Sequence, residues 1–213
     1  MSSARDQILG TLRAGLRGTT QPPLPAAQPP RTLPVAERAE RFAAVLTKVF
    51  GHVDVVANWR EAGVRAAAIL AAANAKSVAL SDAPELREVT AALPASLRQL
   101  PHDAERADLL AADAGLTMAQ YGIAETGTLV LESAREQHRL ASLLPALHLV
   151  VLPRSRLLGT LAEAFARLQQ IGAPSSRTIT FVTGPSRTAD IELELVVGVH
   201  GPKFLHVLLV DDA

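Results

Sequence analysis

The sequence contains no cysteine, and aromatic residues make up only 3% of its 213 residues. Without thiols, the chain has no disulfide, no thiolate nucleophile and no cysteine ligand for an iron–sulfur cluster. The formal net charge is zero, with 21 basic and 21 acidic residues. Nucleic-acid-binding proteins usually combine a basic surface with aromatic rings that stack on bases, so this composition argues against that class.

Long apolar segments are also lacking. The first ten residues, MSSARDQILG, hold no apolar core of a signal peptide, and no run approaches the length that crosses a bilayer. We therefore expect a cytoplasmic protein. The sequence also has no Walker A loop, no dinucleotide-binding glycine motif, no serine nucleophile elbow and no H-E-x-x-H. Nucleotide hydrolysis, dinucleotide redox chemistry and serine hydrolysis therefore lose support.

The N-terminal part differs from the rest of the chain. Residues 3–17 have a helical period with an apolar face and predict a short amphipathic helix. Six prolines between Pro22 and Pro34 then predict a semi-extended linker. We divide the chain into an N-terminal helix and proline-rich arm, residues 1–34, and an α/β domain, residues 35–213. The arm either lies on that domain or docks on a partner or a second subunit.

Helix and strand patterns alternate from residue 35 onward. The predicted helices cover residues 36–50, 59–73, 84–92, 103–113 and 155–170. The predicted strands cover residues 52–56, 76–80, 97–100, 146–152, 178–182 and 204–210. This alternation predicts an α/β fold with a mostly parallel sheet flanked by helices. Asn58 and Pro84 are placed to start the second and third of these helices.

The alternation is interrupted in the middle of the chain. Two β-like runs, 116–121 and 128–131, are separated only by residues 122–127. A crossover helix does not fit in so short a segment, so we expect a hairpin or an irregular bend. Residues 191–195 alternate between apolar and charged, a pattern compatible with a half-exposed strand.

The stretch TGPSRTADIE, residues 183–192, directly follows a β-rich run. We expect it to form a ligand loop at the carboxyl edge of the sheet. Its glycine, hydroxyl, guanidinium and carboxylate groups suit a small anion or polar ligand. The candidate substrate-binding residues here are Gly184, Ser186, Arg187, Thr188 and Asp190. The alternative is a structural turn in which Arg187 pairs with Asp190.

Two further polar clusters adjoin predicted strand ends, ETGT at 125–128 and GVHGPK at 198–203. We expect all three clusters to converge on one pocket. Glu125 is the candidate acid, base or nucleophile, Arg187 the anion clamp and His200 a proton-transfer group. The substrate-binding candidates of the first cluster are Thr126, Gly127 and Thr128. Structural alternatives remain, because Glu125 could cap a turn and His200 could be a hydrogen-bonded structural histidine.

No metal site is expected in this chain. His138 and His148 lie ten residues apart, and the sequence does not place a third protein ligand beside them.

Several of these motifs resemble the lactate-utilisation protein C family, the LUD-domain proteins. The matching segments are GIAETGTLVL at 122–131, Arg139 with SLLP at 142–145 and His148, TGPSRTADIE at 183–192, GVHGP at 198–202 and LHV at 205–207. The resemblance implies a fold similar to the NagB/RpiA/CoA-transferase-like group. It also implies a role in oxidation of L-lactate to pyruvate beside two partner proteins that carry iron–sulfur clusters. A chain without cysteine agrees with a subunit that holds no cluster and no cofactor itself.

Two functions remain open at this point. In the first, the chain is a non-cluster subunit that binds a small carboxylate or other anion. In the second, it is a stand-alone CoA-transferase-like or ligase-like enzyme that acts on a small acid with Glu125 as nucleophile, an idea that rests on fold analogy. A scaffold whose loops brace partner proteins is also compatible with the sequence.

Overall fold

The structure is a computed structural model that describes residues 3–19, 33–137, 139–170, 178–191 and 194–212. The chain separates into two compact units, Met1–Pro30 and Arg31–Ala213. The described part of the first unit is the helix α1 (Ala4–Gly15) and the turn after it. The predicted helix is therefore confirmed, and the Ser3 hydroxyl caps it by accepting the amide hydrogen of Asp6.

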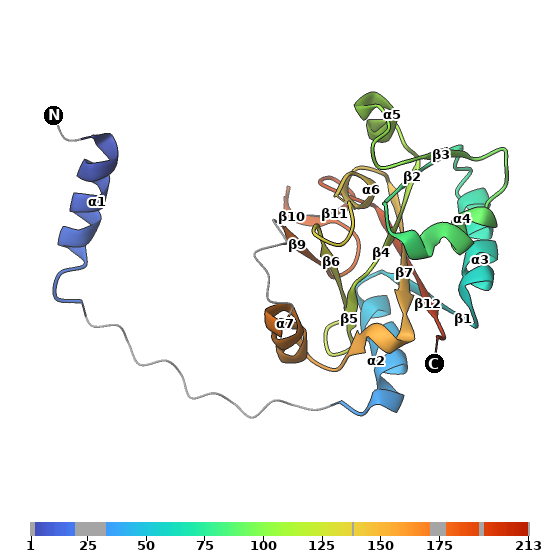
Figure 1. Cartoon of the computed structure of the whole chain (residues 1–213), viewed down its shortest axis with the longest axis horizontal. Helices are drawn as coiled ribbons and strands as arrows, with labels where there is room; N and C mark the ends of the chain where they lie inside the picture. The colour runs from blue at the N-terminus through green and yellow to red at the C-terminus, as the bar shows by residue number, and fades with distance from the viewer. Residues whose placement is uncertain (1–2, 20–32, 138, 171–177, 192–193, 213) are drawn as a thin grey trace. The chain divides into compact units, whose positions relative to one another are not determined.

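A six-stranded sheet organises the second unit (Figure 1). The strands lie in the order β1-β12-β7-β4-β2-β3, and every neighbouring pair is parallel. Their bounds are β1 His52–Val56, β12 Phe204–Val210, β7 Leu147–Pro153, β4 Ala114–Met118, β2 Ser77–Leu80 and β3 Arg98–Leu100. The predicted α/β class with a mostly parallel sheet is therefore confirmed. The closer likeness to the NagB/RpiA/CoA-transferase-like group stays a prediction.

One face of this sheet is covered by α3 (Trp59–Ala72) and α4 (Arg87–Ala91). The Asn58 side chain accepts the amide hydrogen of Glu61 at 2.9 Å, which confirms that Asn58 starts α3. A 3₁₀ turn, η1 (Pro84–Leu86), leads into α4, so the predicted helix 84–92 exists in two parts. The apolar sides of both helices share one buried cluster with the strands.

The opposite face carries α2 (Val35–Lys48), α5 (Arg106–Leu110) and α6 (Arg139–Leu143). Phe42 and Leu46 of α2 are fully buried in a cluster that includes Val150 of β7 and Val207 of β12. Gly115 of β4 lies directly under α6, because a Cβ atom there would be 1.7 Å from the Ala141 carbonyl oxygen. The absence of a side chain at this position lets α6 rest on the sheet backbone.

A second sheet packs on the same face and has the order β8-β5-β6-β9. Its strands are β8 Leu157–Leu158, β5 Tyr121–Ile123, β6 Thr128–Glu132 and β9 Ile179–Val182. β5 and β6 pair antiparallel across the turn 124–127, so the predicted hairpin is confirmed. α7 (Leu161–Gln170) covers the outer side of this sheet through a cluster with Ile123, Val130 and Ala164.

Two predicted elements are wrong in their extent. The run 116–121 is not one strand, because β4 ends at Met118 in the parallel sheet and β5 starts at Tyr121 in the second sheet. Helix 155–170 begins only at Leu161, after the 3₁₀ turn η2 (Arg154–Arg156) and the strand β8. Leu157 and Leu158 continue the helical period in sequence, but they pair with Gly122 and Ile123.

The loop expected at the carboxyl edge of the parallel sheet lies elsewhere. It follows β9 of the second sheet, and its later part forms β10 (Arg187–Ile191), which pairs antiparallel with β11 (Glu194–Val197). The Ser186 amide donates to the Pro202 carbonyl at 2.9 Å, so the loop lies beside the segment that enters β12. That position is the amino edge of the parallel sheet. The carboxyl-edge rule failed because β9 belongs to the second, mixed sheet.

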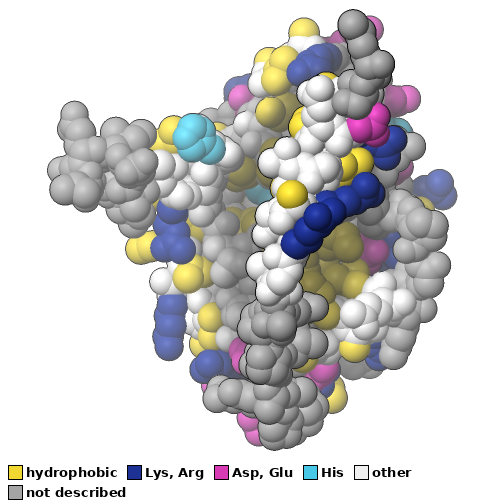
Figure 2. Space-filling model, turned by 90° about the vertical axis from the view of Figure 1, so that its left-hand side faces the viewer, with side chains coloured by type: hydrophobic (Ala, Val, Ile, Leu, Met, Phe, Trp, Pro, Cys, Tyr) yellow, Lys and Arg dark blue, Asp and Glu magenta, His cyan; other side chains and the backbone are white. Residues whose placement is uncertain are grey.

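The surface agrees with the balanced composition. Figure 2 shows basic, acidic and hydrophobic side chains interspersed on the face that it displays. Within the described ranges, no helix has both the length and the apolar character needed to cross a membrane.

Candidate functional site

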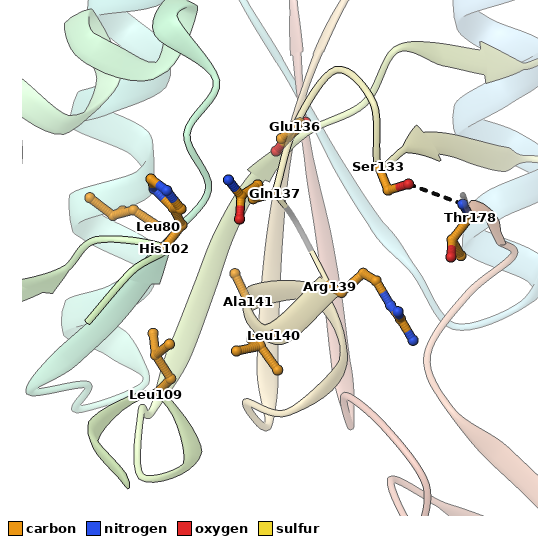
Figure 3. A pocket seen from close by; sticks show the side chains of 10 residues that line it. All are labelled: Leu80, His102, Leu109, Ser133, Glu136, Gln137, Arg139, Leu140, Ala141 and Thr178. Atoms are coloured by element: carbon orange, nitrogen blue, oxygen red, sulfur yellow. Dashed lines mark hydrogen bonds between the residues drawn. The ribbon is translucent and has the colours of Figure 1, made fainter. Parts of the chain in front are cut away.

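A cavity of about 400 Å³, here called the carboxyl-edge pocket, lies beyond the ends of three parallel strands (Figure 3). Leu80 is the last residue of β2, and His102 comes shortly after β3. The Glu136 carboxylate in its wall bonds to the amide of Met118, the last residue of β4. The lining residues are Leu80, His102, Leu109, Ser133, Glu136, Gln137, Arg139, Leu140, Ala141 and Thr178.

The strand order explains why a cavity forms at this place. The chain leaves β2 toward β3 on one side, whereas it leaves β4 toward β7 on the other. The helix α4 follows β2 and lies on one face of the sheet, whereas α6, which follows β6 on the way from β4 to β7, lies on the other. Divergent connections at the carboxyl ends of neighbouring strands leave the crevice in which open α/β sheets bind ligands.

Glu136 is the ionisable group built most deeply into this pocket, since only 2% of the residue is exposed. Its Oε1 accepts the Met118 amide hydrogen at 2.7 Å, and its Oε2 accepts from Nε2 of Gln120 at 2.9 Å. Burial raises the pKa of the Glu136 carboxyl to about 7, and the charge of Asp82 acts in the same direction. Polar groups of Ser81, Met118 and Gln120 oppose that rise. Near neutral pH, Glu136 therefore exists in both protonation states.

Arg139 supplies positive charge to the same pocket. It is the first residue of α6, and its exposed guanidinium forms no ion pair with any residue in the described part of the chain. Figure 3 shows Arg139 extending toward the side formed by Ser133 and Thr178, with Leu80 and His102 on the opposite side. Ser133 and Thr178 hold that side together, because the Ser133 side chain accepts the Thr178 amide hydrogen at 3.0 Å.

Three of the predicted site residues meet in a second, smaller cavity, here called the amino-edge pocket. Gly184, Ser186 and His200 line it, and its volume is about 200 Å³. The other lining residues are Ser142, Leu143, His148, Thr180, Phe181, Val182, Thr183, Pro185, Gly201, Pro202 and Leu205. Most of these come from the motifs that carry the family resemblance. The pocket is largely apolar, with the buried His148 in its wall at 2.8 Å from the Thr117 hydroxyl.

The threonines of the ETGT cluster lie close to this second pocket but outside it. The Thr128 hydroxyl is 2.7 Å from the Thr126 hydroxyl and 2.7 Å from that of Thr183. These three hydroxyls lie along a shallow hollow with the half-exposed rings of Phe165 and Phe181. The ETGT and TGPS segments therefore do meet, through Thr128 and Thr183.

Glu125 and Arg187 line none of these cavities. Glu125 is exposed in the β5–β6 turn and accepts the Leu161 amide hydrogen at the start of α7 at 3.3 Å. The Arg187 guanidinium lies over the Phe50 ring, 5.5 Å from its centre. The expectation of one pocket shared by Glu125, Arg187 and His200 is therefore wrong. Glu125 lies in the β5–β6 turn of the second sheet, and Arg187 starts β10 of a separate two-stranded sheet, whereas His200 lies between β11 and β12.

Both predicted site glycines make close contacts with α2 or with Val49 directly after it. A Cβ at Gly127, where φ is 64°, would be 2.6 Å from the Leu46 amide nitrogen. A Cβ at Gly184, where φ is 88°, would be 2.5 Å from the Val49 carbonyl oxygen. The need for glycine at both positions therefore follows from packing and backbone conformation. Thr188 and Asp190 lie on β10, and the side chain of Asp190 is outside the described residues.

The metal prediction concerned His138 and His148. His138 is outside the described residues. Among the residues that the structure describes, no group of three or more histidine, cysteine, aspartate or glutamate side chains is arranged to hold a metal ion.

Sequence reasoning missed Glu136 and Gln120. A glutamate four residues beyond a strand resembles an ordinary solvated loop residue, and nothing in the pattern shows that it is buried. Arg139, by contrast, already stood among the residues that carry the family resemblance. The strand order is what places residues after β4 and β6 beside the end of β2, and the sequence does not show that order.

Comparison with known proteins agrees with this architecture. The LUD domain model matches residues 39–210. A lactate utilization protein C of Halalkalibacterium halodurans is 41% identical over 104 residues, which cover 47% of this chain and 45% of that protein. The Bacillus subtilis protein of the same name is 38% identical over 104 residues, which cover 47% of this chain and 43% of that protein. The matched segment thus spans less than half the length of these curated relatives.

A solved structure extends the comparison to nearly the whole fold. The crystal structure of a DUF162 family protein from Deinococcus radiodurans superposes with a TM-score of 0.61 at 25% sequence identity. The superposition covers 84% of this chain and 99% of that one. Because the domain model accounts for most of the sequence, the chain belongs to the LUD domain family.

Proposed function

We propose that this chain takes part in lactate utilisation and that its carboxyl-edge pocket binds a small carboxylate such as lactate or pyruvate. The relatives named lactate utilization protein C support the process. The observation that carries the ligand class is the Arg139 guanidinium, which lines the pocket and forms no ion pair within the described part of the chain. A guanidinium presents two parallel N–H groups to a carboxylate, which makes it the side chain best suited to hold one.

The rest of the pocket suits a short hydroxy acid or oxo acid. Leu80, Leu140 and Ala141 provide an apolar side for a methyl group, whereas Gln137 and His102 provide hydrogen-bonding groups. Glu136 supplies a group that accepts or releases a proton near neutral pH. A pocket of about 400 Å³ holds a three-carbon acid together with several water molecules.

The proposal includes partner proteins because lactate oxidation releases electrons. Conversion of lactate to pyruvate removes two electrons and two protons, and the electrons must pass to a redox group. This chain has no cysteine, so a cysteine-ligated iron–sulfur cluster that received them would be held by another polypeptide. In this proposal, the chain binds the carboxylate beside iron–sulfur partner proteins.

Calorimetric titration of the full chain with pyruvate and with L-lactate tests the ligand proposal. We expect Arg139→Gln to weaken binding at least tenfold, because hydrogen bonds between charged groups contribute about 1.5–3 kcal/mol each. Arg60→Gln, an exposed change at the start of α3, is the matched control and should bind like the wild type. The absence of binding by the wild type, or equal binding by Arg139→Gln, would refute the proposal. If Arg187→Gln loses binding while Arg139→Gln binds normally, the ligand binds at Arg187, as first expected from the sequence.

The alternative of a stand-alone acyl-transfer enzyme stays a prediction. Within the described residues, no contact of Glu125 favours a nucleophile, since its recorded bond is to the amide at the start of α7. Labelling of Glu125 by an acyl donor remains the observation that would support that alternative.

A further inference from the structure

Glu136 is the buried ionisable group of the carboxyl-edge pocket, and hydrogen bonds from neighbouring elements fix its position. The Met118 amide and the Gln120 side chain each donate to one of its oxygens. Gln120 is itself held, because its Oε1 accepts the Glu132 amide hydrogen at 2.6 Å. The Gln137 amide donates to Oδ1 of Asp82 at 2.6 Å, which ties the loop carrying Glu136 to the end of β2. The carboxyl is therefore held at the junction of β2, β4 and β6.

The charged groups around this carboxyl come from each neighbouring element. Asp82 follows β2, and its negative charge disfavours ionisation of Glu136. His102 follows β3 and Arg139 begins α6, and both line the pocket. Arg135 on the same loop lies 3.9 Å from Glu132, so its charge is directed to that carboxylate. Arg139 thus brings positive charge to the pocket, and His102 brings an imidazole ring.

A bound carboxylate would add a second negative charge to this cavity. Two carboxylates that share one cavity raise each other's proton affinity, most strongly where one of them is buried as Glu136 is. The ligand is paired with Arg139, so the proton goes to the more deeply buried group. A protonated carboxyl also gains an O–H donor, which an ionised one lacks.

We propose that the carboxyl-edge pocket takes up its carboxylate ligand together with one proton, and that Glu136 carries this proton and donates it in a hydrogen bond to the ligand. This inference rests on the proposed function. It narrows the ligand class to monocarboxylates with a second oxygen, such as 2-hydroxy and 2-oxo acids, whose neutral oxygen accepts that bond. A dicarboxylate would place a further negative charge near Glu136 and Asp82 and should bind more weakly.

The proton can be counted by calorimetry. Titration of the full chain with pyruvate near pH 8, in phosphate and in Tris, gives the number of protons taken up from the difference in apparent enthalpy. We expect uptake approaching one proton, and a dissociation constant that rises about tenfold per pH unit above neutrality. Glu136→Gln should still bind pyruvate, with no uptake and with an affinity that is independent of pH in this range. Glu88→Gln, on the exposed side of α4, is the matched control and should behave as the wild type.

Each outcome supports or overturns a distinct claim. If the wild type binds no pyruvate at any pH, the proposed function fails, and this inference fails with it. If pyruvate binds without proton uptake, this inference alone is wrong, whether or not Glu136→Gln folds. Uptake that persists in Glu136→Gln and disappears in His102→Gln would assign the proton to the histidine and would also overturn the role of Glu136.

Discussion

Gly115 shows how a single residue sets the geometry of the candidate site. It is the second residue of β4, where a Cβ atom would be 1.7 Å from the Ala141 oxygen and 3.2 Å from the Ala141 Cα. The contact is with backbone, so no side-chain rotation relieves it. Because α6 begins with Arg139, the close approach of α6 to β4 also determines where the arginine enters the carboxyl-edge pocket.

Replacement of Gly115 by alanine should therefore be costly. We expect a loss of about 3 kcal/mol in the free energy of unfolding, since overpacking of a rigid contact forces the backbone to move. Urea denaturation followed by circular dichroism measures this loss. Gly10→Ala in α1 is the control, because no atom lies within 4 Å of its Cβ position. A loss below about 1 kcal/mol for Gly115→Ala would show that α6 moves away easily.

At the scale of single residues, the structure brings together only some of the side chains that the sequence assigned to one site. Ser186 and His200 do line one pocket, whereas Glu125 and Arg187 are directed to α7 and to Phe50. Side-chain direction depends on how the second sheet and the β10–β11 pair are oriented, and their orientation is not encoded in the spacing of the motifs. Glu136 was overlooked because its burial arises from strands distant in sequence.

At the scale of elements, the helical and strand periods identified most of the parallel sheet and its helices. The failures occur where two short strands follow each other with no break in the apolar pattern. β4 and β5 are separated by two residues yet belong to different sheets, and β8 has only two residues. Such strands are defined by their partners, so their own sequence does not reveal them.

The helix α1 also stands apart at this scale. None of its described residues is buried, and Ile8, Leu12 and Leu16 are 61%, 56% and 67% exposed along one side. A single helix of this length is marginally stable in water. Burial of its apolar side against another surface would stabilise it. We expect this stripe to contact an iron–sulfur partner protein of the proposed system.

Co-purification with those partners tests the role of α1. Leu12→Asp, or deletion of residues 1–30, should reduce recovery of the partner proteins at least tenfold while leaving the melting temperature of the remaining domain unchanged. Ala14→Asp places the same charge on the opposite side of the helix and should leave recovery unaffected. Undiminished recovery after the deletion would show that α1 is not the docking element.

At the scale of the whole molecule, the order of the strands determines where ligands can bind. The switch between β2 and β4 creates the carboxyl-edge pocket, and the loops between β9 and β12 create the amino-edge pocket. The sequence indicated a parallel sheet and polar loops, but it did not indicate the strand order. Since that order decides which loops become neighbours, the class of fold was predictable and the site was not.

The central claim is that a small carboxylate binds in the carboxyl-edge pocket. Crystals of the full chain soaked in 3-bromolactate, which keeps the 2-hydroxyl group of lactate, test it directly, because anomalous scattering locates the bromine without reference to activity. The account predicts bromine in the carboxyl-edge pocket, with the carboxylate on Arg139 and the hydroxyl group toward Glu136. Bromine only beside Ser186 and His200 in the amino-edge pocket, or no ordered bromine, would contradict the account.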